Sequence, residues 1–309
     1  MFMRLILVAS LLAAGSVLPV RAQVTGVVQP TAPAAVEDDE SWRETLGRFR
    51  VGVVAGHRPA LTARRLVSFR KAMADALDMP VELIFFSTEP AMIAAHRRGR
   101  IEYGVYTATG FAVLNGLCKC GEALAAPTTQ SGEQGFRTVL TPAPGVKDLD
   151  QLRGQTVLMG ADGDLARHWV VGYGLETAGL SPQALGWRMR PQPFATKALA
   201  DLQHGKAKAA FLAEGPDSKT KALWRSPTIR FGPHAVRRSL PAALKDRLAA
   251  WLVDLHDTSP RAHDAIEPVR GGGFQPATNA DYTWLEKALR FHRILPVSRE
   301  AGVLSALRR

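Results

Sequence analysis

The sequence predicts an α/β fold with two lobes, in which each lobe is a mostly parallel sheet flanked by helices and a cleft lies between the lobes. Strand and helix patterns alternate from residue 49 to residue 115, which is typical of right-handed βαβ units. The chain then leaves this unit near residue 136 and returns after residue 214, a single passage each way that is typical of hinged proteins. A glycine-rich bend at 160–164 joins an apolar strand to a helix, and such a turn usually faces a cleft.

The first 22 residues have the pattern of a cleavable signal peptide. Arg4 precedes an apolar run at 5–18, and Val20-Arg21-Ala22 supplies a small-residue cleavage site. The run is shorter than the ~18–20 residues that a membrane span needs. Residues 23–47 are rich in Pro, Ala, Val and acidic residues without periodicity, so we predict a disordered leader there. We therefore expect a protein that is exported to the periplasm.

The remaining chain divides into lobe 1, formed by residues 48–135 and 222–309, and lobe 2, formed by residues 136–221. In lobe 1 we predict strands at 49–55, 81–86, 101–106 and 229–231, with helices that begin near Pro59, Glu89 and Thr107 and a further helix at 242–255. In lobe 2 we predict strands at 136–142, 156–159 and 207–213, a further segment at 185–190, and helices at 147–152, after the bend, and at 195–203.

The candidate ligand-binding residues follow the strands, because sites in such sheets lie beyond the carboxyl ends of the strands. In lobe 1 they are His57, Arg58, Ser87, Thr88, Glu89, Tyr106, Thr107 and Thr109. In lobe 2 they are Asp162, Asp164 and His168, with Glu214 as a further candidate. This mixture suits a ligand with a cationic end and a hydroxyl or anionic end. No cofactor and no metal are expected.

Several of these residues also have a purely structural interpretation. Asp162 and Asp164 are both suited to cap the following helix, and capping is the favoured interpretation. Trp169 and Tyr173 have helical spacing and are expected in the core rather than against a ligand. His168 lies in the first turn of that helix, where a surface role and a site role are equally compatible with the sequence.

Cys118 and Cys120 are the only cysteines, and one residue separates them. In an exported protein this spacing favours a local disulfide or thiol pair, although a bridge between residues so close in sequence would be strained. A Cu(I) site would need more sulfur or imidazole ligands, and no His or Met lies within several residues.

The chain has 39 Lys and Arg against 28 Asp and Glu, a formal net charge of +11 that falls to +9 when Arg4 and Arg21 leave with the signal peptide. The basic residues are scattered and are not interleaved with exposed aromatic residues, so no nucleic-acid partner is expected. The densest clusters, at 97–100 and 237–238, fall at the ends of predicted helices or strands and favour a solvated surface. The excess charge could hold the protein near anionic membrane surfaces or steer acidic partners.

Four segments, at 99–106, 132–137, 146–154 and 271–282, resemble the periplasmic phosphate/phosphite/phosphonate-binding proteins of ABC importers. The resemblance implies the type II periplasmic-binding-protein fold and an exported solute-binding protein that captures a small polar ligand between its lobes. It also implies an inner-membrane ABC permease as partner and a monomer. The alternative is a ligand-sensing or partner-binding protein of the same fold without a transport role.

The family's oxyanion-binding residues are mostly replaced. A Ser-Thr-Ser run of phosphonate-binding relatives falls on Asp164, Leu165 and Ala166, a histidine falls on Phe194, an acidic position falls near Lys208, and a tyrosine falls on Pro90. Only Tyr106 matches. Two carboxylates at this bend would each repel a phosphonate by roughly 1 kcal/mol at close range. The sequence therefore predicts weak or no phosphonate binding.

The sequence gives no sign of an enzyme. It contains no nucleophile elbow, no His-rich zinc pattern and no P-loop. We therefore expect a binding protein without catalytic activity.

Overall fold

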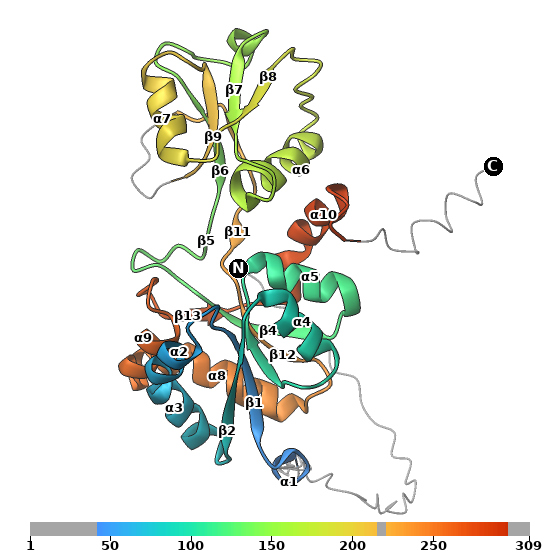
Figure 1. Cartoon of the computed structure of the whole chain (residues 1–309), viewed down its shortest axis with the longest axis vertical. Helices are drawn as coiled ribbons and strands as arrows, with labels where there is room; N and C mark the ends of the chain where they lie inside the picture. Colours follow the sequence, from blue (N-terminus) through green and yellow to red (C-terminus); the bar gives the residue numbers. More distant parts are fainter. Residues whose placement is uncertain (1–41, 215–220, 296–309) are drawn as a thin grey trace, which may run out of the picture. The chain divides into compact units, whose positions relative to one another are not determined.

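The computed structural model describes residues 42–214 and 221–295 (Figure 1). The expected signal peptide and most of the expected leader lie outside the described residues. Residues 42–46 belong to that leader by sequence, but they form the helix α1 (Trp42–Leu46). The prediction of disorder is wrong for this segment, because Trp42 is buried in the hydrophobic core. In the described part of the chain, no helix has the length and apolar composition that crossing a membrane requires.

The first sheet has the strand order β13-β4-β12-β3-β1-β2. Its strands are β1 (Phe49–Val54), β2 (Val81–Phe86), β3 (Tyr103–Val105), β4 (Gly121–Pro127), β12 (His234–Arg237) and β13 (Phe274–Pro276). The strands β1 to β4 run in one direction, and the two strands of the returning chain, β12 and β13, run in the opposite direction. The strand β12 lies between β3 and β4, so the returning chain completes this sheet.

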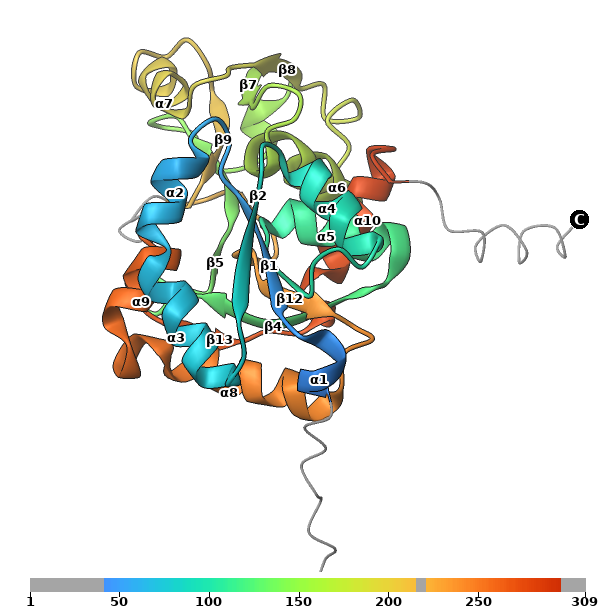
Figure 2. The same cartoon turned by 60° about the horizontal axis from the view of Figure 1, so that its bottom comes forward.

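Helices cover both faces of the first sheet. In Figure 2, α3, α8 and α9 lie on one side of the sheet, and α4, α5 and α10 lie on the other. The helices are α2 (Pro59–Arg65), α3 (Val67–Leu77), α4 (Glu89–Arg97), α5 (Ala108–Cys118), α8 (Ala242–Thr258), α9 (Pro260–Ile266) and α10 (Thr283–Phe291), with the 3₁₀ turn η3 (Asn279–Tyr282). Phe69 and Leu248 pack in the core on one face, and Phe111 and Leu289 pack on the other.

The second sheet has the strand order β10-β6-β9-β7-β8. Its elements are β6 (Thr138–Pro142), η1 (Asp150–Leu152), β7 (Thr156–Met159), η2 (Leu165–Trp169), α6 (Val170–Thr177), β8 (Arg188–Pro191), α7 (Ala195–Gln203), β9 (Ala209–Ala213) and β10 (Trp224–Arg225). Only β6 runs against the other described strands of this sheet. Val171 and Leu175 of α6 pack on one face, and Ala198 and Leu202 of α7 pack on the other. These two sheets with helices on both faces confirm the predicted fold class.

Two antiparallel strands connect the sheets. The strand β5 (Gly135–Phe136) carries the chain from the first sheet to the second, and β11 (Ile229–Arg230) carries it back. They pair with each other, with Phe136 opposite Ile229. A side chain at position 135 would collide with the carbonyl of Ile229, which explains the glycine there. The hinge is therefore a short two-stranded ribbon.

Some boundaries differ from those predicted. Trp224 belongs to the second sheet, although it falls in the segment expected in lobe 1, because it pairs with Leu140 and its ring packs against Phe211. The helix predicted at 147–152 is only the 3₁₀ turn η1. There, the Gln151 side chain accepts from the backbone N–H of Lys147 at 2.8 Å, which provides a local alternative to helical hydrogen bonds.

A candidate ligand cavity at the hinge

A cavity of about 410 Å³ lies where the hinge meets the carboxyl ends of β1 and β3. Its lining residues are Val54, Glu89, Val105, Tyr106, Thr107, Ala108, Phe136, Leu165, Arg230, Phe231, Gly232, His234, Glu267 and Arg270. A second cavity of about 840 Å³ shares Phe136, Phe231 and Arg270 with it. The position agrees with the rule that ligands bind beyond the carboxyl ends of the strands. We define this smaller cavity as the hinge cavity.

The carboxylate of Glu89 occupies the start of α5, a helix that packs on the first sheet. One of its oxygens accepts from the backbone N–H of Thr107 and the other from the Thr107 hydroxyl, both at 2.7 Å. The hydroxyl of Thr107 in turn accepts from the backbone N–H of Gly110 at 2.9 Å. Thr107 is the N-cap of this helix, and Glu89 is the first residue of α4. An anionic ligand would therefore meet a carboxylate at this helix start.

A carboxylate also occupies the start of η2, the helical segment that follows β7 of the second sheet. The carboxylate of Asp164, the N-cap of η2, accepts from the backbone N–H of Arg167 at 2.8 Å. The Arg167 guanidinium is buried and donates to the carbonyls of Phe211, Pro193 and Gln192 at 2.8–3.1 Å. Burial lowers the pKa of Arg167, and Asp164 opposes that shift. The capping interpretation is thus the one that the structure supports for Asp164.

Arg230 is the basic residue of the hinge cavity that lacks a carboxylate partner among the described residues. Its guanidinium donates to the side-chain oxygen of Gln134 at 2.8 Å and to the carbonyl of Pro276 at 2.9 Å. Its Nε is buried and has no hydrogen-bond partner in the described chain. Both accepting groups are neutral, so Arg230 has no ion-pair partner among the described residues, while the carboxylate of Glu89 in the same wall is bonded only to Thr107.

Arg270, the other arginine of this cavity, already has a carboxylate partner. Its guanidinium donates to both oxygens of Glu267 at 3.2–3.3 Å. It also lies over the ring of Phe231, 4.2 Å from the ring centroid, in a cation–π arrangement. Glu267 therefore neutralises Arg270 rather than offering a site for a cationic ligand group.

The remaining walls of the hinge cavity are mostly apolar. Val54 and Val105 come from the first sheet, Phe136 and Phe231 from the hinge region, and Leu165 from η2. His234 also lines the cavity, but burial, with a smaller contribution from His263, lowers its pKa to about 3. It is therefore neutral at physiological pH.

Tyr106, the one family position that matches, does not offer its hydroxyl to the cavity. The hydroxyl is hydrogen-bonded to Nδ1 of buried His96 at 2.8 Å, and Tyr106 is 4% exposed. Burial is the main cause that raises the pKa of this phenol. Its ring packs near Phe111 in the core. Tyr106 therefore serves the packing of the first sheet.

The structure separates most of the other predicted site residues from the hinge cavity. Glu89, Tyr106 and Thr107 line it, whereas the following do not: His57, Arg58, Ser87, Thr88, Thr109, Asp162, Asp164 and His168. His57 and Arg58 are exposed between β1 and α2, Ser87 and Thr88 are exposed between β2 and α4, and Thr109 is half-buried in α5. Thr88 caps α4 by accepting from the backbone N–H of Ala91.

Asp162 and His168 belong to a contact between η2 and the C-terminal end of α10. Nε2 of His168 lies 3.7 Å from a carboxylate oxygen of Asp162, whose side chain is 93% exposed. The His168 ring lies 5.7 Å from that of His292, and Nε2 of His292 is hydrogen-bonded to the carbonyl of Trp169 at 3.0 Å. Tyr173 packs against Trp284, so it belongs to this packing interface, as expected from its helical spacing.

The two cysteines form a disulfide, with a Cα–Cα distance of 5.1 Å. This confirms the local pair that the spacing favoured. Within the described residues, no group of three or more His, Cys, Asp and Glu side chains could hold a metal ion.

Comparisons with known proteins agree with this architecture. A family model described as the periplasmic substrate-binding protein of phosphonate ABC transporters matches residues 51–282, and no curated protein matches the chain. XAC2383 from Xanthomonas citri bound to ATP is similar in fold, with a TM-score of 0.56 and 16% identity over 81% of this chain and 100% of that chain. A TctC solute-binding protein from Polaromonas has a TM-score of 0.52 and 14% identity over 79% of this chain and 98% of that chain.

The family match spans the first sheet, the hinge and the second sheet, and it includes all four segments that carried the resemblance. Members of this family are periplasmic substrate-binding proteins, which bind small ligands and work with ABC transporter permeases. The chain belongs to the family of periplasmic substrate-binding proteins of phosphonate ABC transporters.

Proposed function

We propose that this chain captures an organic anion with an apolar body in the hinge cavity and delivers it to an inner-membrane permease. The protein would reach the periplasm through the signal peptide expected at residues 1–22, act as a monomer, and have no catalytic activity. Family membership favours this transport role over the alternative of a ligand-sensing protein.

The observation that carries the proposal is that the Arg230 guanidinium, beside the apolar walls, has only neutral hydrogen-bond partners and one unused donor in the described chain. A guanidinium that is partly desolvated and bonded only to neutral oxygens attracts an anion more strongly than one that is already paired. Its buried Nε has no partner within the described chain and adds an unused donor beside the cavity. A carboxylate, phosphonate or sulfonate group would supply an ion-pair partner.

The apolar walls of the hinge cavity favour a ligand that also has an apolar part. Val54, Val105, Phe136, Leu165 and Phe231 would exclude water from an alkyl or aryl body but would contribute nothing to a bare phosphate. The sequence led us to expect a ligand with a cationic end. Glu89, the carboxylate that would receive it, has both oxygens hydrogen-bonded to Thr107, whereas Arg230 keeps a donor, Nε, without a partner in the described chain. The geometry therefore favours an anion with an apolar body.

Ligand capture would proceed by hinge closure. The cavity has walls from the first sheet, the hinge ribbon and η2, so a ligand that contacts all three favours the closed arrangement. The expected result is a smaller radius of gyration with ligand than without it, measured by small-angle X-ray scattering.

The experiment is isothermal titration calorimetry with a panel of anions. Inorganic phosphate, methylphosphonate, and alkyl and aryl phosphonates and sulfonates of increasing size test the contribution of the apolar body. ATP belongs in the panel, because XAC2383 of similar fold is described as bound to ATP. Affinity should rise with apolar size, and Arg230→Gln should weaken binding about 10- to 100-fold, because a hydrogen bond to a charged group contributes about 1.5–3 kcal/mol.

The matched control is Arg190→Gln, which removes one positive charge from an exposed position in β8, outside the cavity. It should bind as the wild type does. The proposal fails if the best anion binds Arg230→Gln and wild type equally, or if inorganic phosphate binds as tightly as the larger organic anions.

A further inference from the structure

We propose that the chain has a second site, for a phosphate-bearing anion, in a cavity formed by the C-terminal ends of α4 and α5 and the end of β12. We define it as the basic cavity. It has a volume of about 520 Å³ and is lined by His96, Arg97, Arg98, Gly99, Cys118, Lys119, Cys120, Arg237, Arg238 and Ser239. It shares no lining residue with the hinge cavity. The two densest basic clusters of the sequence, more than 130 positions apart, thus meet in one place.

Backbone hydrogen bonds hold the three chain segments of the basic cavity together. The backbone N–H of Arg238 donates to the carbonyl of Cys120 at 2.8 Å, which joins the end of β12 to the turn after α5. The backbone N–H of Arg237 donates to the carbonyl of Glu102 at 2.9 Å, close to the end of α4. These bonds connect the end of β12 to the segments that follow α4 and α5, so the backbone that carries Arg237 and Arg238 is fixed relative to both.

The charge in the basic cavity is far from balanced. Five cationic residues line it, and no Asp or Glu is among its lining residues in the described chain. The C-terminal ends of α4 and α5 supply about half a negative charge each, which accounts for one of the five cations. An excess of about four positive charges remains in one concave region, and such a region concentrates anions.

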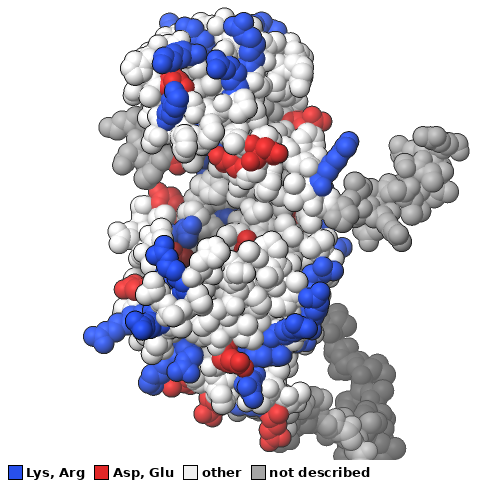
Figure 3. Space-filling model, in the orientation of Figure 1, with Lys and Arg blue, Asp and Glu red and all other residues white. Residues whose placement is uncertain are grey.

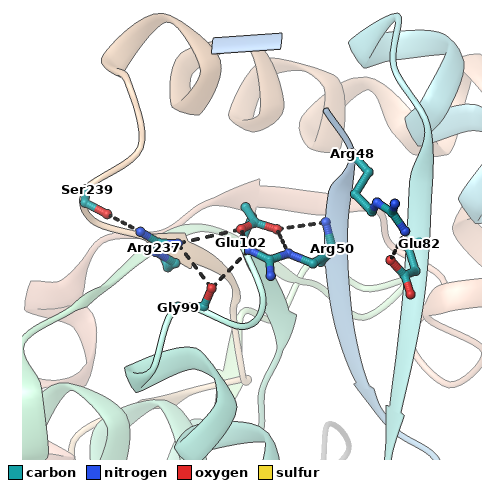
Figure 4. Close-up of polar contacts among 7 residues, drawn as sticks. All are labelled: Arg48, Arg50, Glu82, Gly99, Glu102, Arg237 and Ser239. Carbon is teal, nitrogen blue, oxygen red and sulfur yellow. Dashed lines mark hydrogen bonds and ion pairs between the residues drawn. The ribbon is translucent and has the colours of Figure 1, made fainter. Parts of the chain in front are cut away.

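Nearby carboxylates do not remove this excess. The carboxylate of fully buried Glu102 accepts two hydrogen bonds from the guanidinium of Arg50 (Figure 4). One of its oxygens also lies 3.6 Å from a guanidinium nitrogen of Arg237. Glu102 carries one negative charge against the two guanidinium groups of Arg50 and Arg237, so one positive charge of this group remains. Glu286 lies near Lys119, but it also pairs with Arg290 at 4.0 Å. In Figure 3, Lys and Arg gather along the right-hand edge of the lower half, near α4 and α5.

His96 forms the buried base of the basic cavity. It is 1% exposed, lines the basic cavity, and has an Nε2 with no hydrogen-bond partner among the described residues. Its Nδ1 is fixed by the Tyr106 hydroxyl, which sets the orientation of the ring. The backbone of Cys120 raises the pKa of His96, against the larger lowering by burial, so this ring interacts with the turn that carries Lys119.

The disulfide gives Lys119 a defined place at this cavity. Cys118 and Cys120 flank it, and Lys119 adopts the left-handed conformation (φ 50°) that ends α5. The bridge therefore restrains the backbone that carries the ammonium group. The cysteine pair therefore has a structural role at the basic cavity, and it does not line the hinge cavity.

The chemistry of the lining residues selects a phosphate-bearing anion. Guanidinium groups donate in pairs to phosphate oxygens, and a group of several cations favours multiply charged anions over a single carboxylate. Arg98 and Arg238 are exposed, and the structure gives their side chains no ion pair in the described chain. The phosphate could be free in solution or part of a lipid headgroup, and the test distinguishes the two sources.

The test compares Arg98→Gln/Lys119→Gln/Arg238→Gln with a control that loses the same charge elsewhere. The control is Lys147→Gln/Arg188→Gln/Arg190→Gln, three exposed positions of the second sheet region. Pyrophosphate binding is measured by titration calorimetry, and vesicle binding is measured by sedimentation with phosphatidylcholine, with and without phosphatidylglycerol. The first variant should bind at least about tenfold more weakly than the control in whichever assay detects binding, because close charges interact strongly.

The two sources and the two sites give different results. Pyrophosphate binding that the first triple variant weakens indicates a free phosphate, whereas binding only to vesicles with phosphatidylglycerol indicates the lipid headgroup. Arg230→Gln should leave this binding unchanged while it weakens the hinge ligand. The proposal is overturned if neither probe binds, if both triple variants lose binding equally, or if Arg230→Gln alone removes pyrophosphate binding.

Discussion

The carboxylate of Asp164 accepts a hydrogen bond from the backbone N–H of Arg167 at 2.8 Å, at the start of η2. Glu89 does the same for Thr107 at the start of α5. Backbone N–H groups at helix starts are natural anion donors, but here both are engaged by carboxylates of the chain. The two internal carboxylates thus occupy donors that could otherwise bind ligand oxygens.

We therefore predict that wild-type protein binds methylphosphonate weakly or not at all. Asp164→Ser with Leu165→Thr should increase the affinity, because serine still caps the helix while the repulsive charge is lost. Titration calorimetry measures the change. Asp164→Asn is the matched control, since it caps the helix and removes the charge without supplying a hydroxyl, and it should give a smaller gain. Tight methylphosphonate binding by the wild type would refute the prediction.

Much of the fold could be predicted from local patterns. The strands β1, β2 and β7 fall within one residue of their predicted ends, because apolar runs and glycine-rich bends are short-range signals. The strand β12 was missed, since its insertion between β3 and β4 depends on pairing with segments more than 100 residues away. Short-range patterns carry no information about such pairing.

The hinge cavity was less predictable than the fold. Phe136 lies in a segment that the sequence already marked as a crossing, but Arg230, opposite Gly135, enters the cavity only because β11 pairs with β5. Arg270 precedes a glycine run that carried the family resemblance, which was the one available signal for it. Glu89 and Asp164 were correctly placed at helix starts, yet only the structure shows that their oxygens bond to the chain itself.

The buried carboxylate of Glu102 should be a major determinant of stability. It is 0% exposed and receives the backbone and side-chain N–H groups of Arg50, and this hydrogen bonding is the main cause that raises the pKa of Arg50. Glu102→Gln should lower the free energy of unfolding by about 2–4 kcal/mol, because it leaves two guanidinium groups without their common carboxylate. Urea denaturation measures the loss.

The neighbouring pair Arg48 and Glu82 provides the control for this prediction. Its closest nitrogen and oxygen atoms are 3.4 Å apart, and the two side chains are 66% and 48% exposed (Figure 4). Glu82→Gln should therefore change the free energy of unfolding by less than about 0.5 kcal/mol. Equal effects of the two substitutions would show that burial does not decide the contribution of these ion pairs.

The disulfide should contribute little to ligand capture in the hinge cavity. Cys118 and Cys120 do not line that cavity, and they close a very short loop. Replacing both with serine should leave the affinity of the hinge ligand within a few fold and lower the free energy of unfolding by at most about 2 kcal/mol on the loop-entropy model. Calorimetry and urea denaturation measure the two effects. A large loss of hinge-ligand affinity would contradict this prediction.

Acid should destabilise the protein through two buried histidines. Burial is the main cause that lowers the pKa of His96 to about 4 and the pKa of His234 to about 3. In the unfolded chain a histidine has a pKa near 6.5, so below about pH 6.5 the unfolded state binds protons that the native state does not, and stability falls as the pH falls. Each histidine should lower the free energy of unfolding by roughly 2 kcal/mol between about pH 6.5 and pH 5.

Urea denaturation at about pH 7.5 and pH 5 measures this loss, and one double variant isolates a single histidine. His234 is hydrogen-bonded to the Tyr103 hydroxyl, so Tyr103→Phe with His234→Leu removes both partners and leaves no buried polar group without its partner. The variant should lose about half as much stability as the wild type between the two pH values, whatever its stability at neutral pH. If both proteins lose the same amount, His234 is not a source of the acid sensitivity.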